Sequence, residues 1–115
     1  MTGPTVVCLC GSARFWRAFR FYGLRETLNG RIVLSIGVAA PDAVALAHPQ
    51  DDAGRARKAM LDDLHLRKID LADEILVLNV GGYVGESTAR EVAYAYDHGK
   101  AVRYIENPGC GHSSG

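Results

Sequence analysis

The sequence has no excess of charge of either sign. Among its 115 residues, Lys and Arg together number 13 and so do Asp and Glu, which gives a formal net charge of zero. A protein that binds a nucleic-acid polymer usually has a basic excess, so this balance argues against such a partner. A small anion is still an acceptable ligand, because a few oriented backbone amides and one Arg suffice to bind it.

Long apolar runs and a disulfide framework are also missing. No apolar segment approaches the roughly 20 residues that a membrane span needs, and the first five residues lack the basic-then-apolar order of a signal peptide. Cys8, Cys10 and Cys110 form an odd set, and free thiols in a reducing compartment are the simplest interpretation. We therefore expect a cytoplasmic protein with no membrane partner.

Short β-branched segments alternate with amphipathic ones along the chain. Strands are expected over 5–10, 31–35, 74–79 and 101–105, helices over 15–28, 53–71 and 87–98, and a long binding loop over 36–52. Asn29-Gly30 is expected to end the first helix with a left-handed cap, and Gly99 to cap the end of the third. We predict an α/β fold, a Rossmann-like (flavodoxin-like) three-layer sandwich with about four parallel strands in the order 2-1-3-4 and helices on both faces. A single nucleotide-binding domain would span 1–106, followed by a flexible tail over 107–115.

Apolar spacing assigns an inner face to each of the first two helices. These residues are Phe15, Phe19, Tyr22, Leu24 and Leu28 in the first helix, and Met60, Leu61, Leu64 and Ile69 in the second. His65 lies beside the inner face of the second helix. It is either a proton donor that points into a site or a half-buried histidine packed against its neighbours, and the latter is the commoner role.

Two loops meet where the strand order reverses, between the first and third strands, which is where ligands bind in such sheets. The first loop is Gly11-Ser12-Ala13-Arg14. It offers a close backbone approach, a hydroxyl, helix-N-terminal amides and a guanidinium, all suited to phosphate. It is equally consistent with a tight turn in which Ser12 caps the helix and Arg14 lies in solvent.

The second loop runs from Val80 to Glu86, includes Gly82 and Gly85, and opens the third helix as a candidate anion cradle. It matches neither the dinucleotide fingerprint nor the Walker pattern. If Ser87 or Thr88 caps the helix, Glu91 lies in its first turn, where a carboxylate could attack the anomeric carbon of a ribosyl group. Thr88-Ala-Arg-Glu91 is also a complete capping box, in which Glu91 would only close the helix start.

Two further patterns are weaker. Cys8 and Arg14 have the Cys-x5-Arg spacing of tyrosine phosphatases, in which a low-pKa thiolate and an Arg hold phosphate. However, Cys8 lies inside the strand, and Phe15 stands where those enzymes have Ser or Thr. Cys110 and His112 in the tail lack the third and fourth ligands of a zinc site. We predict no metal and no cofactor.

Taken together, these segments resemble a small branch of the nucleoside 2-deoxyribosyltransferase superfamily, which includes nucleoside 5'-monophosphate N-glycosidases. The resemblance covers about residues 6–104. It rests on Cys10-Gly-Ser12 after the first strand, on Ala72-Asp-Glu-Ile75 at the third, and on Gly85-x5-Glu91-x3-Ala95.

The resemblance implies that Glu91 is the nucleophile and that the partner is a small-molecule nucleoside or nucleotide. It also implies a homodimer or higher homo-oligomer. His65 stands where the family has an Asp that assists base departure, so His65 is the candidate acid. The implied binding residues are Gly11, Ser12, Ala13, Arg14, Gly82, Gly85, Ser87 and Thr88.

The functional hypothesis is therefore an N-glycosidic bond hydrolase or a 2-deoxyribosyltransferase that acts on a nucleoside or nucleoside 5'-monophosphate. A non-catalytic nucleotide sensor with the same cleft is the alternative, and the histidine at position 65 favours it. A cysteine-dependent phosphatase is the third possibility.

Overall fold

A computed structural model describes residues 3–37 and 51–107 of the chain. Most of the predicted loop over 36–52, and all but the first residue of the predicted tail, lie outside the described residues. The elements are β1 (Val6–Cys10), η1 (Ala13–Phe15), α1 (Trp16–Leu28), β2 (Ile32–Leu34), α3 (Asp52–Leu71), β3 (Glu74–Val77), η2 (Val80–Gly82), α4 (Glu86–Asp97) and β4 (Ala101–Tyr104). Their bounds differ from the predicted ones by at most two residues.

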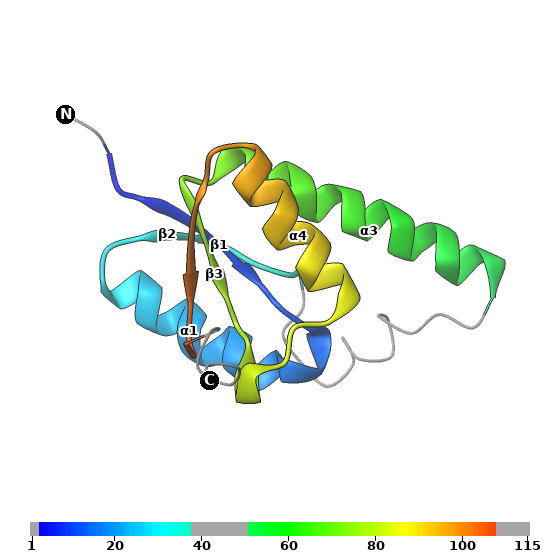
Figure 1. Cartoon of the computed structure of the whole chain (residues 1–115), viewed down its shortest axis with the longest axis horizontal. Coiled ribbons are helices and arrows are strands. Elements are labelled where there is room, and N and C mark those ends of the chain that lie inside the picture. The colour runs from blue at the N-terminus through cyan, green and yellow to red at the C-terminus, as the bar shows by residue number, and fades with distance from the viewer. Residues whose placement is uncertain (1–2, 38–50, 108–115) are drawn as a thin grey trace.

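The four strands form one parallel sheet in the order β2-β1-β3-β4, which confirms the predicted α/β fold and strand order. Helix α1 packs on one face of the sheet and α3 and α4 pack on the other (Figure 1). The predicted three-layer arrangement follows from this placement. Two predicted helix ends are also confirmed, since Gly30 after α1 and Gly99 after α4 have left-handed φ values of 87° and 71°.

Strand β1 is buried on both faces. Cys8 and Cys10 belong to the core between the sheet and the α3–α4 layer, while Val7 and Leu9 belong to the core beneath α1. All four side chains are fully buried. Because successive strand residues point to opposite faces, this register places both thiols on the side of α3 and α4.

The predicted inner faces of α1 and α3 are partly wrong. In α1, Leu24 and Leu28 are exposed, whereas Glu26 is buried. In α3, Ile69 is buried but Met60, Leu61 and Leu64 are 42–51% exposed. In α3 one cause is length: the helix has 20 residues, or about 30 Å, and it extends past strands that span less than about 20 Å (Figure 1).

None of the described helices, α3 included, is both long enough and apolar enough to cross a membrane.

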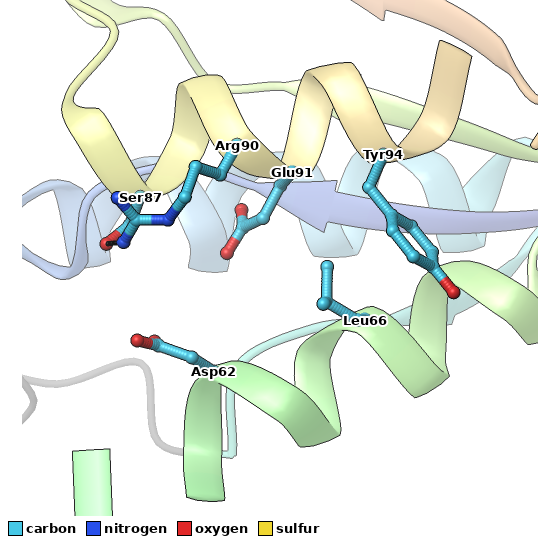
Figure 2. A pocket seen from close by; sticks show the side chains of 6 residues that line it. All are labelled: Asp62, Leu66, Ser87, Arg90, Glu91 and Tyr94. Carbon is cyan, nitrogen blue, oxygen red and sulfur yellow. Dashed lines mark hydrogen bonds between the residues drawn. The ribbon is translucent and has the colours of Figure 1, made fainter. Parts of the chain in front are cut away.

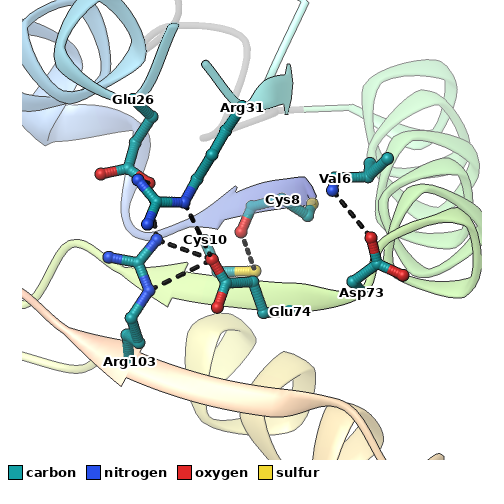
Figure 3. A network of polar contacts seen from close by, with 8 residues as sticks. All are labelled: Val6, Cys8, Cys10, Glu26, Arg31, Asp73, Glu74 and Arg103. Carbon is teal, nitrogen blue, oxygen red and sulfur yellow. Dashed lines mark hydrogen bonds and ion pairs between the residues drawn. The ribbon is translucent and has the colours of Figure 1, made fainter. Parts of the chain in front are cut away.

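The buried carboxylate of Glu26 is held by two arginines (Figure 3). Arg103 Nη2 donates to Glu26 Oε1 at 2.5 Å and to Glu74 Oε2 at 2.8 Å. Arg31 lies 3.4 Å from Glu26 Oε1 and 3.6 Å from Glu74 Oε2. This network joins α1 to β3, to β4 and to the residue that precedes β2.

We expect Glu26→Ala to lower the free energy of unfolding by about 1–3 kcal/mol, because it leaves two partly buried arginines without one of their acceptors. Urea denaturation measures the change. The matched control is Asp63→Ala, which removes an exposed pair with Arg67 at 3.9 Å and should cost less than about 0.5 kcal/mol. Equal losses in the two variants would contradict a structural role for the Glu26 network.

Candidate functional site

A cavity of about 550 Å³ opens at the carboxyl edge of the sheet, within the size range of small-molecule sites. Its walls are the β1–η1 turn, the segment that leads into α4 (Tyr83, Gly85 and Glu86), the first turns of α4 and one side of α3. The predicted site residues that line it are Gly11, Ser12, Ala13, Arg14, His65, Gly85, Ser87, Thr88 and Glu91. Gly82 is exposed and is not among the lining residues. The structure thus brings nine of the ten residues together, and their roles stay predictions.

The β1–η1 turn passes very close to β3. A Cβ atom at Gly11 would lie 3.1 Å from Leu78 Cβ and 3.3 Å from Leu78 O, so glycine permits this approach. The Ser12 hydroxyl accepts a hydrogen bond from Arg14 N at 3.3 Å and caps η1. The Arg14 guanidinium lies 4.7 Å from the centroid of the Tyr83 ring. Arg14 therefore contacts the second loop as well as lining the cavity.

The predicted cap of α4 is wrong. The N-cap residue is Gly85, with extended backbone and no side-chain cap, and the helix begins at Glu86. Thr88 is buried inside the first turn, so it is not available to pair with Glu91 as a capping box. Glycine is an acceptable N-cap, and the helix therefore starts before the residues that we expected to cap it.

The Glu91 side chain points from α4 into the gap between α4 and α3 (Figure 2). A second hollow of about 120 Å³ between the two helices shares Glu91, Asp62 and Ser87 with the larger cavity. Among the described residues, Glu91 Oε1 is buried with no hydrogen-bond partner. Burial raises the pKa of the Glu91 carboxyl, and the nearby His65 only partly offsets this.

His65 reaches from α3 toward both Glu91 and β1. Its Nε2 atom lies 3.8 Å from Glu91 Oε1, 3.6 Å from Cys8 Sγ and 3.4 Å from Cys10 Sγ. Burial acts to lower the pKa of His65, but the hydrogen bond to Cys8 and the charge of Glu91 outweigh it, so the pKa is raised. His65 therefore contacts three ionisable groups and is not simply packed against apolar neighbours.

The two thiols of β1 have opposite properties. The pKa of Cys8 is lowered to about 5, first by its hydrogen bond with Cys10 and also by His65 and Lys68, against the effect of burial. The pKa of Cys10 is raised by the same hydrogen bond and by burial. Cys8 therefore favours the thiolate and Cys10 the thiol. We refer to Cys8, Cys10, His65 and Glu91 as the Cys-His-Glu cluster.

Cys8 does not have the setting of a phosphatase nucleophile. Its side chain is fully buried in β1, and it is not among the residues that line the cavity. Arg14 lies on the cavity wall. The Cys-x5-Arg spacing therefore does not bring the thiol and the guanidinium into one phosphate-binding loop.

Sequence analysis missed the contribution of α3 to the cavity. Lys58, Leu61, Asp62 and Lys68 line the same wall as His65. Lys58, Leu61 and Asp62 lie seven, four and three residues before His65, and Lys68 lies three residues after it, which is the spacing of one helix face. Helical spacing counted from His65 therefore identifies these four positions in the sequence. Four other lining residues lie in loops that were predicted to bind: Ile36 and Gly37 in the loop over 36–52, and Tyr83 and Glu86 in the loop from Val80 to Glu86. Leu64 also lines the cavity and was not predicted to do so.

The two lysines of this wall already have partners. Lys58 Nζ lies 3.1 Å from Asp62 Oδ2, and Lys68 Nζ donates to Ser35 O at 2.6 Å. Lys68 thereby ties α3 to the end of β2, beside the cavity mouth. The wall presents positive charge near the cavity without leaving a buried charge unpaired.

Comparison of the chain with protein-family models, with curated proteins and with solved structures gives no match.

We expect one thiol of the folded, chelator-treated protein to stay ionised well below the usual range. The pKa of Cys8 in the folded protein is about 5, whereas the pKa of a free cysteine is about 8.5. The ultraviolet absorbance of the thiolate should therefore persist at pH values below the pKa of free cysteine and disappear near pH 5. His65→Ala removes a contact that lowers the pKa of Cys8, so it should move the loss to higher pH. Persistence of the same signal in Cys8→Ser would contradict the assignment.

Proposed function

We propose that this protein hydrolyses or exchanges the N-glycosidic bond of a nucleoside or nucleoside 5'-monophosphate, with Glu91 as the nucleophile. The observation that carries the proposal is the buried Oε1 atom of Glu91, which has no hydrogen-bond partner among the described residues and lies beside a cavity of about 550 Å³. A carboxylate suits this reaction because the transition state at the anomeric carbon resembles an oxocarbenium ion. Structural carboxylates at such depth normally have hydrogen-bond partners.

The neighbouring groups fit the two halves of such a reaction. Glu91 would attack C1' and form a glycosyl-enzyme ester while the base departs. His65 lines the same cavity, and its raised pKa favours the protonated form that can donate a proton to the leaving base. Water, or a second base in the transferase, would then attack C1' and release Glu91.

The opposite rim of the cavity fits a phosphate or sugar. The Gly11–Ala13 backbone, the Ser12 hydroxyl and the Arg14 guanidinium line one side, and Ser87 lines the other. Helix-terminal amides and a guanidinium are common phosphate ligands. These groups support a small anionic substrate and the assignment of Arg14 to its phosphate.

A homodimer is our proposal for the assembly. Met60, Leu61 and Leu64 form an exposed apolar strip on α3. Leu61 and Leu64 also line the cavity. A second copy on this strip would cover apolar surface beside the site.

The second candidate function is a nucleotide sensor without turnover. Its support is the position of the His65 Nε2 atom, which lies within 3.6 Å of both thiols and is therefore engaged away from a substrate. Saturable nucleotide binding with no release of free base would favour this candidate.

Glu91→Gln should lower the rate of base release from the best ribo- or deoxyribonucleoside 5'-monophosphate by more than about 10³-fold, because an amide is a poor nucleophile. Chromatography of free base measures the rate. Asp97→Asn is the matched control, since Asp97 is an exposed carboxylate at the far end of the same helix. Absence of base release by the wild-type protein from every nucleotide tested would overturn the proposal.

Arg14→Ala should raise KM for a nucleoside 5'-monophosphate by about 10-fold or more, because it removes a charge-assisted contact worth roughly 1.5–3 kcal/mol. The KM for the matching nucleoside should change much less. Comparison of the two substrates in wild type and variant measures the difference. An equal effect on both substrates would show that Arg14 does not bind the phosphate.

A further inference from the structure

The donor atoms of the Cys-His-Glu cluster have the spacing of metal ligands. The Sγ atoms of Cys8 and Cys10 and a ring nitrogen of His65 all lie within 4.8 Å of one another. The two Sγ–Nε2 distances are 3.6 and 3.4 Å. Zinc bonds of about 2.3 Å to sulfur and about 2.0–2.1 Å to nitrogen, at tetrahedral angles, place S and N about 3.5 Å apart. The three groups therefore already stand near ligand–ligand distance.

Glu91, the fourth member of the cluster, lies beside these three donors but outside their group. Its Oε1 atom lies 3.8 Å from His65 Nε2 and is buried without a hydrogen-bond partner among the described residues. A cation held by the two thiols and the imidazole would therefore have a carboxylate next to it, and opposite charges at this depth compensate each other.

The chemistry of the donor set also suits a cation. The thiolate is the form of cysteine that binds metal, so both thiols would release their protons on binding. A bound divalent ion would compensate the negative charges of the two thiolates, which burial otherwise penalises. Two sulfur donors and one imidazole select zinc-like ions over magnesium or calcium, which prefer oxygen ligands.

Two rigid elements carry the three donors: β1 the two thiols and α3 the imidazole. We propose that Cys8, Cys10 and His65 form a binding site for a thiophilic divalent cation of the zinc class at the floor of the cavity, with the Glu91 carboxylate beside it. An ion can reach this site because His65 and Glu91 line the cavity. Since the bound ion engages His65 and lies beside Glu91, it would block their part in ribosyl chemistry, so the metal would act as an inhibitor of the proposed enzyme.

The test is titration of the full chain, reduced and freed of metal, with Co²⁺, whose spectrum reports its ligands. We expect one equivalent to bind and to give thiolate-to-cobalt charge-transfer absorption in the near ultraviolet, with intense visible bands of four-coordinate cobalt. One equivalent of Zn²⁺ should abolish both. Absence of the charge-transfer band at one equivalent of Co²⁺ would overturn the proposal, whatever the variants do.

Variants locate the site. Cys8→Ser and Cys10→Ser should each weaken Co²⁺ binding by more than about 100-fold, since loss of an outer-sphere partner alone costs 10–100-fold. Glu91→Gln, a near-isosteric change, should keep the charge-transfer band. Cys110→Ser is the matched control, and loss of the band in this variant would place the metal elsewhere and overturn the proposal. Circular dichroism identifies any variant that fails to fold.

The metal site and the hydrolase can fail separately. The cobalt spectrum tests the metal site without any substrate. Base release in the presence of a chelator tests the hydrolase without any metal. If both proposals hold, Zn²⁺ should suppress base release at the concentration at which it displaces Co²⁺.

Discussion

The burial of β1 on both faces is the constraint on which the site depends. The strand pairs with β2 on one edge and with β3 on the other, and helices cover both of its faces. Each side chain of residues 7–10 therefore points to a fixed face of the sheet, because a register shift of one residue would exchange the side chains on the two faces. In the observed register the thiols face His65 and Glu91, and Gly11 follows at the point where the chain must pass close to Leu78. The turn that lines the cavity is a consequence of this register.

The length of α3 shapes the rest of the site. Its second half packs on the sheet through Ile69, and its first half extends beyond the strands and forms a wall of the cavity through Lys58 and Leu61. A helix no longer than the strands would leave the carboxyl edge open on this side. Met60, which lies in this first half, is exposed for the same reason.

Much of the fold could be predicted from local patterns, whereas contacts between elements could not. Strand runs, helical spacing and the glycines at 30 and 99 gave the elements and two helix ends, and topology rules gave the strand order. The capping box failed because Gly85 is the N-cap of α4, and a matching motif does not establish where a helix starts. Contact between Cys8 and His65 joins residues 57 apart in the chain. The alternation of Cys8 and Cys10 showed that they share a face, but not which helix covers it.

The buried Glu26 and the half-buried Glu91 show how a structural carboxylate differs from a candidate functional one. Glu26 is 1% exposed and receives a hydrogen bond from Arg103 and an ion pair from Arg31, so its negative charge is compensated within the fold. Glu91 has only His65 within 4 Å as a cationic partner among the described residues, and His65 also contacts both thiols. The folded chain thus keeps at Glu91 a desolvated oxygen that it does not satisfy, at a cost that natural cores normally avoid. Such a cost is typical of a site that binds something, and a sugar carbon or a cation at that oxygen would each offset it.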